Sequence, residues 1–329
     1  MTYSLIFLGL GLLVVFIIAV LWIRLEQTNK RVEKELKTAA IKFLDGPGSI
    51  KNFSLLPLVD YYAHGNLETE AGVSYLIQAD ATRLLLDVGA NEKKVHPSPL
   101  ISNMKALGVD LSTLDGIVIS HVHQDHVGGI QEEKNRVFSL SRGSVDLPPI
   151  PVWTPGRLAC SAYNPGAEPI NVSNPLLIKK GIALTGPLPA SLFLLGYTIE
   201  QSLVFNVGKK GLVLVLGCGH PTIPVILDRV KRMFQAPIYA ILGGFHLPVA
   251  GGRMNLGPLN LQNIIGSNRM PWHYLNKKDV FETIRVIQKE SPSLVALSPH
   301  DSSDWAMDQF QHAFGPRCVS IEVGKAIEI

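Results

Sequence analysis

The chain is poor in cysteine for its length. Its 329 residues include three cysteines, Cys160, Cys218 and Cys318, which is a low and odd number. Small secreted domains that depend on disulfides carry more cysteines, usually in even number. The composition therefore argues against a disulfide framework and favours a reducing compartment.

Clustered charge of one sign is also scarce. Charged residues make up 17% of the chain, the formal net charge is +3, and no run of five like charges occurs. Proteins that bind nucleic acid normally carry basic patches or stripes. We therefore predict that the partners of this protein do not include nucleic acid.

The N-terminal segment lacks charge altogether between Tyr3 and Ile23. A helix of this length, at about 1.5 Å per residue, crosses a hydrocarbon core of about 30 Å. A buried core helix would keep a polar stripe, and a cleaved signal peptide would have basic residues before a shorter apolar run. Residues 1–23 are therefore predicted to form a transmembrane anchor.

Basic residues follow this apolar segment, at Arg24, Lys30, Arg31, Lys34 and Lys37. The positive-inside rule then predicts a single-pass protein with its C-terminal domain on the cytoplasmic side. Residues 24–49 are predicted to be a helical stalk that ends near Gly46. The stalk would either pack on the domain or on a second copy, or serve as a solvated spacer.

The remaining residues, 50–329, are predicted to form one domain. Short apolar runs typical of strands alternate with segments of helical periodicity, a pattern that indicates a layered α/β protein. The strand candidates are 72–78, 82–87, 114–120, 150–153, 201–206, 211–216, 238–242 and 294–297, and the helical candidates are 102–107, 222–234, 277–290 and 303–313.

A cluster of metal-binding residue types follows the strand candidate 114–120. It comprises His121, His123, Asp125 and His126, followed by two glycines. His121 and His123 would point to the same side, because side chains alternate along a strand. A turn after them would bring Asp125 and His126 to the same pocket from another direction. Two ligand sets from one loop suit two metal ions about 3.5–4 Å apart.

Further ligands are predicted at the ends of other apolar strands, where α/β proteins build their sites. The candidates are His220, His246 and His300. Cys218 is either a thiolate ligand or a small buried filler. Asp87 either anchors the metal loop through hydrogen bonds or forms a plain turn. The other histidines at 64, 96, 273 and 312 lack this context and are assigned to surface or packing roles.

The motif H-x-H-x-D-H followed by Gly-Gly resembles the metallo-β-lactamase superfamily. Further blocks between residues 50 and 329 resemble the branch of dihydropterin-type, methanopterin-precursor synthases; they include Gly72–Ile77, Leu86–Gly89, Gly217–His220 and Gly243–Leu247. Two positions depart from that branch. Asp60 is followed by Tyr61 instead of Asn, and His300 is followed by Asp-Ser-Ser instead of Cys-Thr-Gly.

The resemblance implies an αββα sandwich with a mono- or dinuclear metal site at one edge of two sheets. We expect two divalent ions, zinc by preference, with iron or manganese as alternatives. One ion would be held by His121, His123 and a further histidine such as His220. The other would be held by Asp125, His126 and either His246 or His300.

The predicted function is that of a membrane-anchored hydrolase for a small-molecule substrate. A metal-bound hydroxide would attack an ester, lactone, amide or phosphodiester, and Asp125 would orient it and carry its proton. The segment from about 250 to 278 would form a lid or substrate wall, or a plain surface excursion. The alternatives are a non-catalytic metal-dependent binder of a pterin-like molecule and an iron-dependent redox protein.

Overall fold

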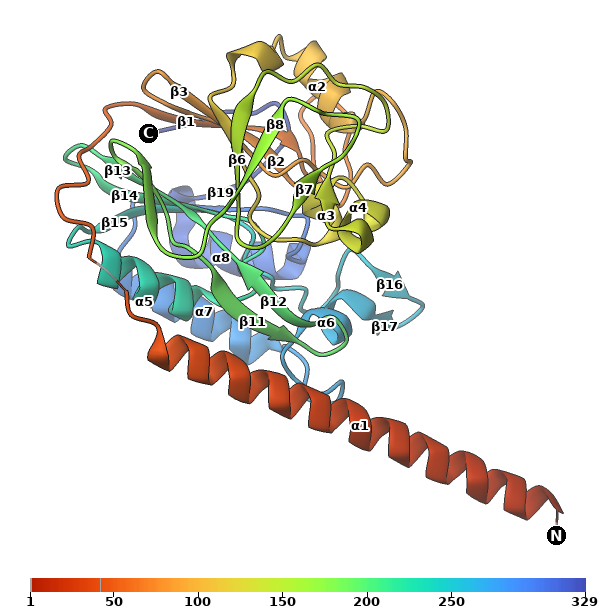
Figure 1. The fold of residues 1–329 in the computed structure, drawn as a ribbon. Coiled ribbons are helices and arrows are strands. Elements are labelled where there is room, and N and C mark those ends of the chain that lie inside the picture. Colours follow the sequence, from red (N-terminus) through yellow and green to blue (C-terminus); the bar gives the residue numbers. More distant parts are fainter. Residues whose placement is uncertain (1, 42) are drawn as a thin grey trace.

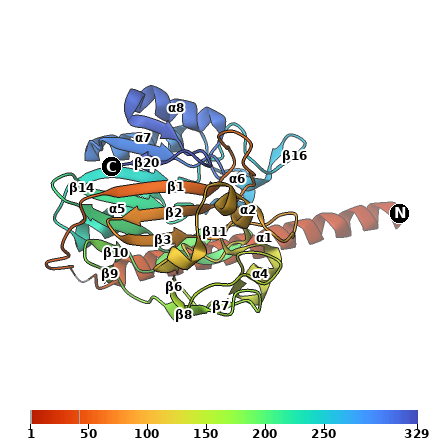
Figure 2. The ribbon, with the colours of Figure 1, turned by 90° about the horizontal axis from the view of Figure 1, so that it is seen from above.

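The computed structural model describes residues 2–41 and 43–329. Within these residues most of the strands form two seven-stranded sheets that face each other (Figures 1 and 2). The first sheet has the order β20 (Ile327–Glu328), β1 (Phe53–Val59), β2 (Ser74–Ala79), β3 (Thr82–Leu86), β4 (Gly116–Val118), β6 (Ile150–Thr154) and β8 (Ala167–Asn171). The second has the order β19 (Cys318–Ser320), β18 (Leu294–Leu297), β15 (Ile238–Gly243), β14 (Gly211–Leu216), β13 (Leu203–Val207), β10 (Ile182–Leu184) and β9 (Leu176–Lys179).

Helices cover the outer faces of both sheets. The first sheet packs against α2 (Pro99–Ala106), and the second packs against α5 (Ile223–Met233), α7 (Lys277–Glu290) and α8 (Asp304–Phe314). The predicted αββα architecture is therefore confirmed. The remaining α-helices are α1 (Thr2–Thr38), α3 (Gln124–Val127), α4 (Ile130–Asn135) and α6 (Leu261–Gly266). The remaining strands form the pair β5 (Val137–Phe138) and β7 (Ala159–Cys160) and the hairpins β11 (Leu188–Leu192) with β12 (Gly196–Glu200) and β16 (Asn255–Leu256) with β17 (Leu259–Asn260).

The strand β14 has a continuous apolar sequence because both of its faces are buried. Leu212, Leu214 and Leu216 point to the helix-covered face, whereas Val213 and Val215 point into the core between the sheets. Every residue of the strand is buried, because neither face meets water. Each large apolar side chain buried in this way contributes about 1.5–3 kcal/mol to folding.

Parallel pairing directs several strand ends to one edge of the sandwich. β14, β15 and β18 are neighbours and run parallel, and in the first sheet β3 runs parallel to β4. The chain leaves the carboxyl ends of these strands through Cys218, His246, His300, Asp87 and Ser120. The topology therefore gathers polar side chains from five distant segments at one place.

The stalk predicted for residues 24–49 is helical only in its first part, because α1 continues without a break to Thr38. Its C-terminal half packs on the domain: Tyr197 donates a hydrogen bond to Glu35 at 2.6 Å, and the guanidinium of Arg31 lies 3.7 Å from the centre of the Tyr197 ring. The structure thus favours the packed alternative over a free spacer.

Candidate metal centre

Three histidines form the first group of candidate ligands. His121 and His123 follow β4, and His220 follows β14; one nitrogen from each lies within 4.8 Å of the others. His123 Nδ1 lies 3.1 Å from His220 Nε2. His121 Nε2 and His220 Nδ1 are buried and have no hydrogen-bond partner among the residues described. Buried nitrogens without partners are costly, and a bound cation would remove that cost.

A second group lies beside the first and consists of Asp125, His126, Cys218 and His300. Cys218 Sγ lies 3.0 Å from His126 Nε2 and 3.1 Å from His300 Nε2, and Asp125 Oδ2 lies 3.4 Å from His126 Nε2. Imidazole, thiolate and carboxylate together are a donor set that suits zinc. The ring centres of His121 and His126 are 4.1 Å apart, so the two groups are adjacent, and the residues fit a pair of divalent ions.

Asp87 makes hydrogen-bonding contacts to one histidine of the second group and, through Ser120, to one histidine of the first. One carboxylate oxygen of Asp87 contacts His126 Nδ1 at 2.7 Å and accepts a hydrogen bond from Ser120 Oγ at 2.6 Å. Ser120 Oγ lies 2.9 Å from His121 Nδ1. Asp87 thus contacts His126 directly and His121 through Ser120, as an anchoring residue would, and this role stays a prediction.

Asp60 is linked to His300 through Ser298, in the way that Asp87 is linked to His121 through Ser120. Its carboxylate accepts hydrogen bonds from Ser298 Oγ at 2.6 Å and Tyr75 Oη at 2.7 Å, and Ser298 Oγ in turn contacts His300 Nδ1. Burial raises the pKa of Asp60 to about 7. The sequence did not reveal this role, because Asp60 and Ser298 come from opposite ends of the domain.

Glu200 holds the loop that carries Cys218 and His220. Its buried carboxylate accepts hydrogen bonds from the backbone N–H groups of Cys218, Gly219 and His220, at 3.1, 2.8 and 2.9 Å. A carboxylate that binds three successive amides fixes the backbone and thereby the directions of the side chains. Glu200 is a further residue whose role the sequence did not indicate.

Close backbone contact brings the ends of β14 and β15 together. A Cβ at Gly244 would lie 2.3 Å from the carbonyl oxygen of Gly217, 2.4 Å from Asp301 Oδ2 and 2.7 Å from the Cα of Cys218. Only glycine therefore fits at this position. The same Asp301 oxygen accepts a hydrogen bond from the backbone N–H of His246 at 2.9 Å.

His246 lies next to both groups but belongs to neither. Its ring centre is 4.5 Å from that of His220, its backbone φ is +50°, and both of its ring nitrogens lack hydrogen-bond partners in the described part of the chain. The geometry of the second group therefore favours His300 over His246 as the ligand. A ligand role for His246 stays a prediction.

The electrostatics keep most of the imidazoles neutral. Burial lowers the pKa of His123 and His246 to about 4 and that of His300 to about 3. Neutral imidazole is the form that binds a metal. Burial alone would raise the pKa of Asp125, but its interaction with His126 outweighs this effect and leaves the pKa below its ordinary value. Asp125 is thus a carboxylate at neutral pH.

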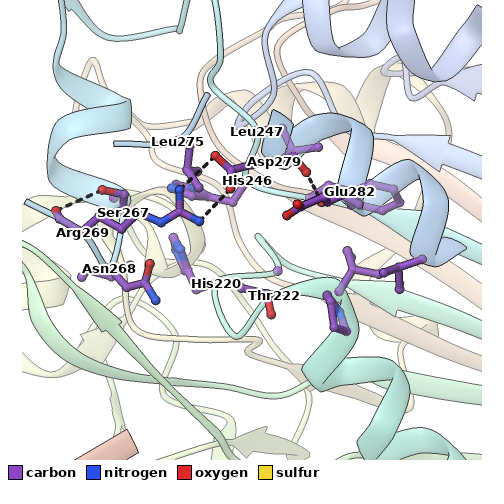
Figure 3. Close-up of a pocket in the computed structure, with 18 of the residues that line it drawn as sticks. His220, Thr222, His246, Leu247, Ser267, Asn268, Arg269, Leu275, Asp279 and Glu282 are labelled. Carbon is purple, nitrogen blue, oxygen red and sulfur yellow. Dashed lines mark hydrogen bonds and ion pairs between the residues drawn. The ribbon is translucent and has the colours of Figure 1, made fainter. Parts of the chain in front are cut away.

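Two cavities meet at the candidate centre. One, of about 310 Å³, is lined by His123, Asp125 and His300 together with the apolar Leu195, Met254 and Ile265. The other, of about 440 Å³, is lined by Ser267, Arg269 and Asp279 among others (Figure 3). His220 and His246 line both cavities. Arg269 in the wall of the second cavity pairs with Asp279, at 2.7 and 3.0 Å (Figure 3).

We expect Asp87→Asn to weaken metal binding about 10- to 100-fold. The amide keeps the size of the side chain but not its charge, and asparagine tolerates the positive φ of +58° at this position. Titration of the metal-free protein with zinc against a competing chelator measures the effect. An unchanged affinity would show that Asp87 does not orient the imidazoles.

Comparison with known proteins identifies the family. A family model described as the metallo-beta-lactamase superfamily matches residues 67–227. Among solved structures, the fold is similar to that of Tm1679, a metal-dependent hydrolase of the beta-lactamase superfamily, with a TM-score of 0.55 and 20% identity over 84% of this chain and 99% of that chain. The chain therefore matches the metallo-β-lactamase superfamily over residues 67–227 and has the fold of that superfamily.

Two proteins of similar sequence and one further solved structure agree with this match. The chain is 25% identical over 238 residues, 61% of its length and 79% of the relative, to the 7,8-dihydropterin-6-methyl-4-(beta-D-ribofuranosyl)-aminobenzene-5'-phosphate synthase of Methanocaldococcus jannaschii. A shorter match, 44% identical over 66 residues, covers 20% of this chain and 23% of the anti-Pycsar protein Apyc1 of Bacillus phage 010DV004. Zn-bound PqqB from Methylobacterium extorquens shares the fold, with a TM-score of 0.50 and 11% identity over 84% of this chain and all of that chain.

The prediction of a metallo-β-lactamase superfamily member similar to the methanopterin-precursor synthases is therefore confirmed. Members of the superfamily are metal-dependent enzymes of generally hydrolytic type, and the fold implies binding of divalent metal. From the sequence, Cys218 is either a thiolate ligand or a buried filler; in the structure its sulfur lies between two histidines, as a ligand's would. The signal that could have revealed it is its position two residues before His220 at a strand end.

Proposed function

We propose that this protein is a membrane-anchored, metal-dependent hydrolase of esters, lactones, amides or phosphodiesters. One observation carries the proposal: two adjacent groups of candidate ligands, His121–His123–His220 and Asp125–His126–Cys218–His300, both contribute side chains to the wall of one cavity, namely His123, Asp125, Cys218, His220 and His300. Two neighbouring divalent ions, when bound, supply Lewis acidity and lower the pKa of coordinated water.

The chain's own groups supply positioning and proton transfer. The Asp125 carboxylate is about a quarter exposed, faces the cavity and is ionised at neutral pH, so it can orient the attacking water and accept its proton. The neutral His246 ring, whose nitrogens find no partner in the described chain, can donate a hydrogen bond to a substrate oxygen. Leu195, Met254 and Ile265 form the apolar part of the cavity wall.

A second candidate function follows from the similarity to the M. jannaschii synthase, whose name contains a dihydropterin. In this alternative the cavity binds a pterin-like molecule without hydrolysing it. The residues after His300, Asp301-Ser302-Ser303, depart from that branch, and Asp301 is occupied by the backbone of His246. This departure at the rim of the site favours a different substrate and hence the first proposal.

The test is a hydrolysis screen with protein of measured metal content. Chromogenic phosphodiesters, lactones and carboxylic esters are offered to the zinc-, manganese- and iron-loaded full chain, and dihydropterin binding is measured in parallel. Metal-dependent turnover of one class supports the hydrolase. Tight dihydropterin binding without any turnover would favour the binder, and oxygen uptake by the iron form would favour the redox alternative.

The anchor part of the proposal rests on α1. Among the described residues, this helix alone is long and apolar enough to cross a membrane, and its apolar window, with a mean hydropathy of 3.1, is not buried in the protein. A core helix would be buried. The basic residues after the helix support a cytoplasmic domain.

We expect Leu13→Arg combined with Phe16→Arg to release the protein from the membrane fraction. Each arginine at mid-helix costs about 2.5–3.5 kcal/mol of insertion free energy. Fractionation at high salt and alkaline pH measures the result. The matched control is Leu176→Arg with Leu177→Arg on β9, which should remain in the membrane fraction. Release of the unaltered chain by alkaline extraction would contradict a spanning helix.

A further inference from the structure

The apolar half of α1 leaves the domain without a linker. Leu21 and Leu25 pack against Phe193 and Met270 of the domain. A Cβ at Gly196 would lie 2.8 Å from Arg24 Nη2, so the guanidinium of Arg24 rests on the tip of the β11–β12 hairpin. The helix is therefore fixed to the domain up to the residue at which its apolar segment ends.

The length of the apolar part of α1 that extends beyond the domain determines where the membrane surface lies on the protein. From Tyr3 to Ile23, a helix rising about 1.5 Å per residue spans roughly 30 Å, which is the whole thickness of a hydrocarbon core. Trp22 and Arg24 at its end are residue types that favour the interface. The interface therefore falls where α1 meets Phe193, and the domain lies directly on it.

Exposed apolar side chains surround this point. Leu194 and Leu195 follow Phe193 at the tip of the β11–β12 hairpin, and Leu256 and Leu259 on the β16–β17 hairpin are 64% and 52% exposed. Both views show the β16–β17 hairpin projecting on the side from which the free half of α1 extends (Figures 1 and 2). Trp272, two residues after Met270, is also exposed. Exposed apolar side chains gathered beside an anchor are typical of a membrane-contacting surface.

The same loops form the wall of the candidate metal centre. Leu195 lines the cavity that contains His123, Asp125 and His300, and Met254, next to the β16–β17 hairpin, lines it as well. The apolar part of the cavity therefore adjoins the surface formed by the two hairpins. A molecule that enters between Leu195 and Met254 would reach the centre from the membrane surface.

We propose that the two hairpins rest in the interface of the bilayer that α1 crosses, and that the candidate metal centre takes its substrate, an amphiphile, from that bilayer. The amphiphile's apolar part would pass between Leu195 and Met254, and its ester or phosphodiester would reach His123 and Asp125. The substrate class rests on the proposed function, whereas the docking of the hairpins does not.

Fluorescent labels test the docking independently of activity. In a Cys160→Ser background, where the remaining Cys218 and Cys318 are buried, a nitrobenzoxadiazole label is placed at Leu194→Cys, Leu256→Cys or, as control, Leu177→Cys. Leu177 is 39% exposed on β9, away from the free end of α1 (Figure 2). The full chain is reconstituted in vesicles of phosphatidylcholine and phosphatidylglycerol that carry doxyl-labelled acyl chains.

We expect the doxyl lipid to reduce emission from positions 194 and 256 about twofold or more and to leave position 177 unchanged. Quenching at 194 and 256 no greater than at 177 would overturn the docking.

Activity tests the substrate class. Leu256→Glu with Leu259→Glu should lower hydrolysis of a fluorogenic phospholipid analogue in vesicles about tenfold and leave a soluble short-chain analogue within about twofold. Leu176→Glu with Leu177→Glu is the matched control and should change neither rate. Equal effects on the rates with both substrates, or no effect on the rate with the lipid analogue, would overturn the proposal that the substrate is an amphiphile. Failure of the unaltered chain to hydrolyse any substrate would instead refute the proposed function, and the label result would still stand.

Discussion

His123→Ala is expected to lower kcat/KM about 10³-fold or more and to reduce bound metal from two ions per chain to about one. His123 lies 3.1 Å from His220 and is one of three histidines in the first group, so its loss leaves a site with two nitrogens. A thousandfold loss corresponds to about 4 kcal/mol of transition-state stabilisation. Steady-state kinetics and elemental analysis of the purified full chain measure both quantities.

The matched control is His64→Ala, since His64 is exposed and its side chain makes no hydrogen bond within residues 2–41 and 43–329; its backbone N–H donates to the carbonyl of Val323. This variant should keep full activity and full metal content. If His123→Ala kept both as well, the first group would not hold a metal.

Cys218→Ala is expected to remove the other ion and to lower kcat/KM about 10²-fold or more. The thiol lies within 3.1 Å of both His126 and His300, and alanine offers no donor atom in its place. A cysteine that merely filled space would instead cost about 1 kcal/mol of stability and would leave the metal content unchanged. Metal analysis with thermal unfolding separates the two roles.

Cys318→Ala provides the comparison, because Cys318 is also buried and packs in the core of the second sheet away from the candidate ligands. It should lower the melting temperature slightly and keep two ions per chain. Cys218→Asp, which restores a donor atom, should recover part of the metal content. Full metal in Cys218→Ala would show that the thiol is not a ligand.

The strongest features could be predicted because they are local in sequence. His121, His123, Asp125 and His126 occupy one loop, and His220 and His300 each follow a continuous apolar strand. Strand ends at one sheet edge are a general site of ligand binding, so these residues could be grouped without a structure.

The supporting residues could not be predicted, because their contacts depend on the pairing of distant strands. Asp60 reaches Ser298 across 238 residues of sequence, and Glu200 reaches a loop about 20 residues later. The direction of the His246 ring depends on a positive φ and on its packing against Gly266, where a Cβ would lie 2.4 Å from Nε2. No periodicity encodes such contacts.

Element boundaries were predicted less well than element types. The helix expected to start after Ser102 begins at Pro99, because Ser98 caps it by accepting a hydrogen bond from the N–H of Ile101. Proline at the first helical position was the signal that should have moved the start. The segment from about 250 to 278, expected to be a lid, a substrate wall or a plain surface excursion, supplies Met254, Gln262 and Ile265 to the cavity lining.

Anomalous diffraction from crystals of the metal-loaded protein would locate the two metal ions directly. We expect two peaks about 3.5–4 Å apart, one among His121, His123 and His220, and one among Asp125, His126, Cys218 and His300. A map without a peak within coordinating distance of these side chains would contradict the account.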